Sequence, residues 1–108
     1  MKVLSLKVDT STLNLGEEEK KMTITDLVTR VINNVLYNYS QQTRGLIKVD
    51  RNMFYYLTKL FEKAVKENLE SVELSDEECG FIRKCFRETR LSPSALLQEV
   101  EEIIDNLK

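Results

Sequence analysis

Hydrophobic residues recur through most of this chain every three or four positions, the spacing that places them on one face of a helix. The spacing predicts four helices, over residues 24–39, from Asp50 to the residues before Glu70, over 76–89 and over 93–107. Their buried stripes are expected to be Ile24, Leu27, Val28, Val31, Ile32, Val35, Leu36 and Tyr39; Met53, Phe54, Leu57, Leu60, Phe61, Ala64 and Val65; Cys79, Phe81, Ile82, Cys85 and Phe86; and Leu96, Leu97, Val100, Ile103, Ile104 and Leu107.

Polar residues mark where these helices should begin. Ser75 and Glu78 have the spacing of a capping box, in which the hydroxyl and the carboxylate satisfy each other's backbone N–H groups. Ser92 followed by Pro93 is a second start signal, because proline suits the first helical position. Asp50 is the expected cap of the second helix, and Thr23 or Thr25 that of the first. Between the first two helices lies a loop, residues 40–49, whose apolar pair Leu46-Ile47 we expect to pack inside.

The amino terminus has a different pattern. Residues 1–8 alternate between apolar and polar side chains, which predicts a β-strand, and residues 22–24 are expected to pair back on it across a charged turn. We therefore expect one domain over residues 1–108 with a mainly α (α+β) fold. It would consist of a β-hairpin over residues 1–24 and four helices over residues 25–108, the last two forming an antiparallel helical hairpin because their link is short.

Composition describes an ordinary globular domain, with 42% hydrophobic and 31% charged residues among 108. No apolar run approaches the roughly 20 residues of a membrane-spanning helix, and residues 1–8 lack the apolar core of a signal peptide. We therefore expect a cytoplasmic protein, located in the host cell if it is viral, with no membrane contact.

Charge is distributed unevenly along the chain. Residues 1–69 carry 11 basic and 8 acidic side chains, a balance of +3, and residues 70–108 carry 5 basic and 10 acidic ones, a balance of −5. With a net charge of −2, general affinity for nucleic acid is not expected. The acidic carboxyl-terminal hairpin would suit a basic protein face better than a phosphate backbone.

Catalytic chemistry finds little support in the sequence. The chain has no histidine, the commonest general base and metal ligand. Cys79 and Cys85 lie six residues apart on one predicted helix, a rise of roughly 9 Å that exceeds the ~7 Å limit between the Cα atoms of a disulfide. The carboxylates, Glu78 among them, fall at helix starts and outer faces, where nothing in the pattern buries them. We expect no enzyme, no metal site and no cofactor.

Candidate partner contacts cluster in the middle of the chain. All four tyrosines lie between residues 37 and 56; Tyr39 and Tyr56 belong to or flank apolar stripes, whereas Tyr37 and Tyr55 project from polar faces. Exposed tyrosine is a common interface anchor. Basic residues accompany these tyrosines, so the candidate contacts are Tyr37, Tyr55, Arg44, Lys48 and Arg51.

Residues 70–108 resemble a ribbon-helix-helix regulator. A short extended piece, Ser71 to Leu74, precedes the capped helix, a brief turn and the second capped helix. In that family paired ribbons enter the DNA major groove, and the resemblance would make Ser71 and Glu73 the outward, base-reading residues. An acidic residue there would repel phosphate, so a transcriptional regulator that uses residues 70–108 is the alternative interpretation.

A second resemblance covers residues 15–107. Small phage and prophage proteins of unknown function show a helix entry similar to Met22–Val28, a second one similar to Val72–Glu78 and a proline-started last helix like that of residues 93–107. This resemblance implies an accessory or host-interaction role and assigns no functional residue. We therefore interpret the chain as a non-catalytic protein–protein interaction module of a phage or mobile element. Its partner would be another protein or a second copy, as in a homodimer, and not nucleic acid.

Overall fold

The computed structural model describes residues 2–6, 16–92 and 94–107. The chain is mainly α, with one two-stranded sheet. Its elements follow the order β1 (Lys2–Ser5), α1 (Glu17–Lys20), α2 (Ile24–Gln42), α3 (Lys48–Lys66), β2 (Ser71–Leu74), α4 (Asp76–Glu88) and α5 (Ala95–Asp105). The sequence therefore predicted the fold class and each of the longer helices, whereas the short α1 falls where only a charged turn was expected.

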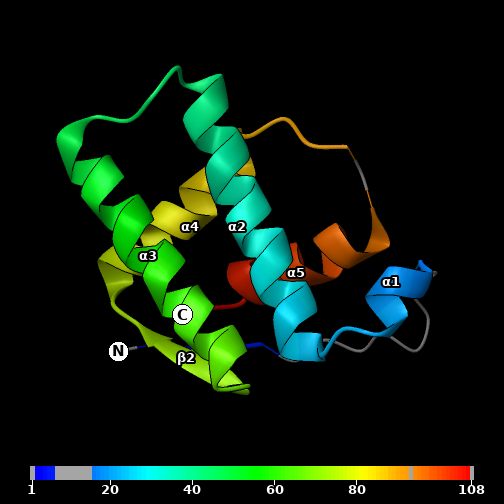
Figure 1. The fold of residues 1–108 in the computed structure, drawn as a ribbon. Coiled ribbons are helices and arrows are strands. Elements are labelled where there is room, and N and C mark those ends of the chain that lie inside the picture. Colours follow the sequence, from blue (N-terminus) through cyan, green and yellow to red (C-terminus); the bar gives the residue numbers. More distant parts are fainter. Residues whose placement is uncertain (1, 7–15, 93, 108) are drawn as a thin grey trace.

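Helix α2 is the centre of the molecule. It packs against α3, α4 and α5, and α3 lies beside it (Figure 1). Helix α4 leads away from β2, and α5 returns toward the sheet, so the last two helices form the predicted hairpin (Figure 1). Gln42 ties the link between them to the end of α2: its amide donates to the Arg90 carbonyl oxygen and accepts from the Arg90 N–H, both at 2.9 Å.

The sheet joins distant parts of the chain. Strand β1 runs antiparallel to β2, with Leu4 opposite Val72, so the predicted pairing of residues 1–8 with residues 22–24 is wrong. Alternation explains the choice, because Leu4 in β1, Leu6 just after it, and Val72 and Leu74 in β2 give a buried apolar face. Residues 22–24 offer no such face, and they begin a helix instead.

Helix starts follow local capping chemistry, with two corrections. The Thr23 hydroxyl accepts from the Asp26 N–H at 3.1 Å, which starts α2 at Ile24. Ser75 and Glu78 form the predicted capping box. Ser94 and not Ser92 caps α5, accepting from the Leu97 N–H at 3.0 Å. The expected role of Pro93 lies outside the described residues.

The other correction concerns α3. The residue at its amino-terminal boundary is Ile47, which offers no side-chain cap, and Asp50 lies inside the first turn. There its carboxylate faces Lys84 of α4, with a distance of 4.0 Å between Asp50 Oδ2 and the Lys84 Nζ. A negative charge in the first turn still suits the helix dipole. Asp50 was expected to cap the helix, but it pairs with Lys84 of another helix, a contact that the local sequence pattern does not reveal.

Both ends of the α2–α3 hairpin use the same turn. Arg44 after α2 and Asn68 after α3 adopt left-handed backbone conformations, with φ of 58° and 51°. In each case the next residue donates back across the turn, Gly45 to the Ser40 carbonyl and Leu69 to the Ala64 carbonyl, both at 2.9 Å. These are Schellman motifs, which end a helix by satisfying its last carbonyl groups. The first of them turns the chain so that α3 returns along α2.

Candidate functional site

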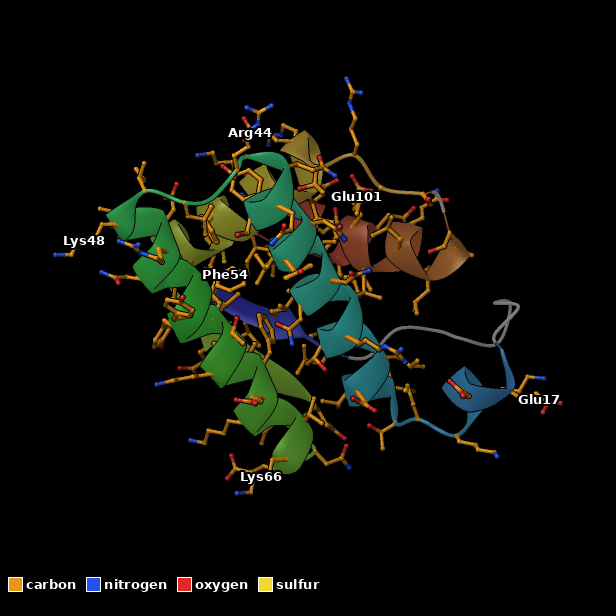
Figure 2. The ribbon with its side chains drawn as sticks, turned by 45° about the horizontal axis from the view of Figure 1, so that its top comes forward. Glu17, Arg44, Lys48, Phe54, Lys66 and Glu101 are labelled. Atoms are coloured by element: carbon orange, nitrogen blue, oxygen red, sulfur yellow. The ribbon has the colours of Figure 1, made fainter. Side chains whose placement is uncertain are left out.

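The turn between α2 and α3 forms an exposed corner of the molecule, which we define as residues 43–56. Its shape follows from the Schellman turn, after which the chain reaches Ile47 and enters α3 directly. Figure 2 shows Arg44 and Lys48 near the two ends of this loop, both directed away from the helices. The corner is therefore the outer end of the α2–α3 hairpin.

An open hollow of about 250 Å³ lies on this corner. Its apolar walls come from Leu46, Phe54 and Tyr55, and the Arg51 side chain stands at its border. The rings of Phe54 and Tyr55 meet edge to face, with centroids 5.8 Å apart, which fixes the orientation of this wall. A concave apolar surface with a few polar groups at its rim is the usual form of a binding site.

Exposed hydrophobic side chains belong to the same corner as the hollow, and Tyr55 is the one among them that lines it. Ile47 and Val49 are each 71% exposed, and Tyr55 and Tyr56 are 58% and 54% exposed. The expectation that Leu46 and Ile47 pack inside is wrong for Ile47, because the extended residue before α3 directs its side chain into solvent. Sequence reasoning missed Ile47 and Val49 as candidate contacts, and the only signal was their position between Arg44 and Arg51 in a polar segment.

The cations of the corner form no ion pair with any residue that the structure describes. Across residues 2–6, 16–92 and 94–107, no acidic group pairs with Arg44, Lys48 or Arg51. Asp50, the nearest acid in the sequence, is engaged with Lys84. Lys48 and Arg51 lie one helical turn apart, and Tyr55 follows Arg51 by one more turn, so the three share one side of α3. The structure thus brings Arg51 and Tyr55 together at the hollow, whereas Lys48 and Arg44 belong to the same corner but do not line it.

Asp50 is held by a small network that fixes α3 against α4. The Lys84 ammonium also lies over the Tyr39 ring, 5.8 Å from its centroid. A hydrogen bond with Tyr39, together with the nearby Tyr39 and Asp50 charges, raises the pKa of Lys84. Tyr39 itself is buried, as predicted, and stacks edge to face on Phe81. The corner therefore rests on a rigid base.

Tyr37 is the candidate contact that the structure leaves apart. Its side chain is 56% exposed, as the sequence predicted, but it belongs to α2 and is not among the residues that line the hollow. Tyr37 and Tyr55 are consequently equivalent in residue type and exposure and differ in their surroundings. The pair provides a matched comparison for any experiment on the corner.

Three further depressions lie elsewhere on the surface. A hollow of about 470 Å³ separates α1, α2 and α5, and one of about 300 Å³ lies between α2 and the α4–α5 link. Val31 contributes to both, and each adjoins residues outside the described range. A third, of about 620 Å³, is bordered by five long charged side chains near the end of α3 alone, so it has no rigid opposite wall.

The two cysteines of the chain are buried in the core. Cys79 and Cys85 are free thiols inside the core, as predicted. Burial raises the pKa of both, that of Cys85 to about 12, so both thiols remain protonated and weakly nucleophilic at neutral pH. Among the described residues, no group of three or more potential ligands could hold a metal ion, and no helix is long and apolar enough to cross a membrane.

One carboxylate departs from expectation. Glu78 is buried, with only 9% of its surface exposed, although the sequence indicated no burial. Its side chain folds back on the helix start, where Oε1 accepts from the Ser75 N–H at 2.9 Å. Oε2 is buried and has no hydrogen-bond partner within the described part of the chain. Its folded-back conformation forms part of the capping box.

The chain matches no known protein family, no curated protein and no solved structure.

Proposed function

We propose that this chain is a non-catalytic protein–protein interaction module whose contact surface is the α2–α3 corner. The observation that carries the proposal is the exposure of Ile47, Val49 and Tyr55 on one corner, where Tyr55 and Arg51 line an open hollow. Tyrosine and arginine are enriched among the residues that dominate binding energies at interfaces, and exposed apolar patches mark interaction sites.

The chemistry of the core favours binding over catalysis. The chain has no histidine. Its two thiols are buried with a raised pKa, which removes the thiolate that a nucleophilic cysteine needs. The exposed cations lie on the outer surface of one helix hairpin and do not converge on an enclosed site. The resemblance to small phage proteins adds the proposal that the partner is a protein of the infected cell.

The rival interpretation is a regulator that uses β2, α4 and α5 as a ribbon and two helices. The order of these elements matches, and Ser71 and Glu73 are the exposed residues of the ribbon. However, one edge of β2 is already paired with β1 of the same chain, and the exposed Glu73 would repel phosphate. The cations of the corner lie on other elements, which favours the interaction module.

The Tyr55→Ala and Tyr37→Ala variants test the proposal. Both side chains are more than half exposed, so each change should alter the free energy of unfolding by less than about 0.5 kcal/mol. Only Tyr55→Ala should weaken partner binding. A photo-reactive phenylalanine analogue at position 55, in cells that contain the natural partner, should give a discrete cross-linked protein product that the same analogue at position 37 does not give.

The opposite pattern, with products from position 37 and none from position 55, would reject the corner as the contact surface. A fall of several degrees in the Tm of Tyr55→Ala would show instead that this ring supports the fold. Measurement of the Tm of both variants therefore precedes the cross-linking.

A further inference from the structure

We infer that the α2–α3 corner binds an acidic protein segment that inserts one aliphatic or aromatic side chain into the hollow. The inference rests on the proposed function and specifies the chemistry of the partner. It combines the charge of the corner, the backbone conformation of Arg44 and the lining of the hollow.

The corner carries three available positive charges, one of which, Arg51, lies at the hollow. Arg44, Lys48 and Arg51 have no ion-pair partner in the part of the chain that the structure describes. The one acid among them, Asp50, is paired with Lys84 of α4. Carboxylates of a partner would therefore meet three cations without competition from the chain itself. Opposite charge across an interface favours encounter and fixes orientation.

The backbone at Arg44 gives an independent indication. Its φ of 58° places it at the left-handed position of the Schellman turn, where glycine, lacking a Cβ atom, is the least strained residue. The Arg44 guanidinium forms no hydrogen bond or ion pair within the described residues that would offset this strain. Binding of the Arg44 guanidinium to a partner would explain why a long cationic residue, and not glycine, occupies this backbone position.

The lining of the hollow suits an apolar anchor. The hollow is open and has a volume of about 250 Å³. Within it, Leu46, Phe54 and Tyr55 offer apolar surface to one inserted side chain. Ile47 and Val49 are exposed on the same corner, where they would extend the apolar contact to neighbouring residues of the segment.

These features favour a protein segment over a nucleic acid. Ile47 and Val49 offer exposed aliphatic surface that a sugar–phosphate backbone does not complement. Farther along α3 the cations alternate with Glu62 and Glu67, and Lys63 is paired with Glu67 at 3.9 Å. A continuous basic track, which a phosphate backbone would need, is therefore interrupted.

Fluorescence anisotropy with short labelled peptides tests the inference on the intact chain. The probe is a peptide of aspartate and glutamate residues with one central leucine. Its controls have alanine at the centre, or lysine and arginine in place of the acids. We expect the leucine peptide to bind about tenfold more tightly than the alanine peptide, because three additional carbon atoms become partly buried. The basic peptide should not bind, and an increase in ionic strength from about 50 to 300 mM should weaken the acidic complex.

Three variants locate the site. Arg51→Gln and Arg44→Gly should each weaken binding of the acidic leucine peptide several-fold, and Tyr37→Ala should leave it unchanged. Arg44→Gly is informative because it relieves the left-handed strain, so its urea midpoint should rise while its affinity falls. A loss of affinity in that variant would not result from unfolding.

Several outcomes would overturn the inference. These are equal binding of the leucine and alanine peptides, tighter binding of an oligothymidylate than of the acidic peptide, and salt-dependent self-association through the corner in sedimentation velocity. A basic or neutral partner captured by cross-linking from position 55 would also reject it, while leaving the proposed function intact. The absence of any cross-linked product from position 55 would reject the proposed function itself.

Discussion

Ile104 shows how the last helix is held at the scale of single residues. Its side chain is completely buried in the cluster formed by all the longer helices and the sheet, whereas the adjacent Ile103 is only partly buried. We predict that Ile104→Ala lowers the free energy of unfolding by about 2–5 kcal/mol, because it removes buried carbon atoms and leaves a cavity. Urea denaturation measures the loss, and Ile103→Ala should cost clearly less. Equal losses would show that α5 is rotated from its assigned face.

Cys85 gives the fold a dependence on alkaline pH. Burial raises the pKa of its thiol from 9.0 to about 12 in the folded chain. As pH rises above 9, the unfolded chain loses this proton before the folded chain does, so the contribution to stability is complete below pH 9 and decreases between pH 9 and 12. We predict that the urea midpoint falls between about pH 8 and about pH 10.5, and falls less in Cys85→Ala. Parallel pH profiles for the two proteins would contradict the prediction.

At the scale of elements, capping residues determine where helices begin. Ser94 caps α5 through the Leu97 N–H, and Ser92, two residues earlier, is part of the exposed link. Ser94→Ala should therefore cost about 1 kcal/mol of unfolding free energy, and Ser92→Ala less than about 0.5 kcal/mol. Thermal denaturation of the two variants distinguishes them. A larger effect at Ser92 would restore the start that the Ser92-Pro93 pair predicted.

The elements also show which sequence signals are reliable. The capping box at Ser75 and Glu78 was predicted because both partners lie within four residues of each other. Asp50 was expected to cap the second helix, yet its carboxylate faces Lys84, 34 positions later in the chain. Hydrogen bonds between near neighbours can be inferred from spacing, whereas an ion pair between two helices depends on how they pack.

At the scale of the whole molecule, the sheet brings the two halves of the chain together. Leu4 and Leu6 from the amino terminus complete the same core as Val72 and Leu74. We predict that Leu4→Ala destabilises the protein by about 2–5 kcal/mol and that unfolding remains a single transition. Far-UV circular dichroism and tyrosine fluorescence should report the same lowered midpoint. Separate midpoints would mean that the sheet and the helices unfold independently.

The candidate site was only partly predictable. Tyr55 and Arg51 could be identified because a tyrosine and a cation on the polar side of an amphipathic helix must face solvent. The hollow between them could not, because it depends on how the Schellman turn at Arg44 sets Leu46 against Phe54. For the same reason the exposure of Ile47 was not foreseen: an apolar residue in a loop is buried only if the turn directs it inward.

The sequence alone determined the helices, most of their buried faces and the capping box of α4, because these depend on periodicity and on contacts between residues a few positions apart. Ile24 and Val65, at helix ends and expected to be buried, are 38% and 37% exposed. Tertiary structure alone decided that β1 pairs with β2 and that Asp50 faces Lys84. It also decided that Tyr55 and not Tyr37 borders a hollow. These outcomes join residues that are distant in the chain or depend on the path of a loop. Any of several partners would have satisfied the same local pattern, and only the packing of the complete core selects one.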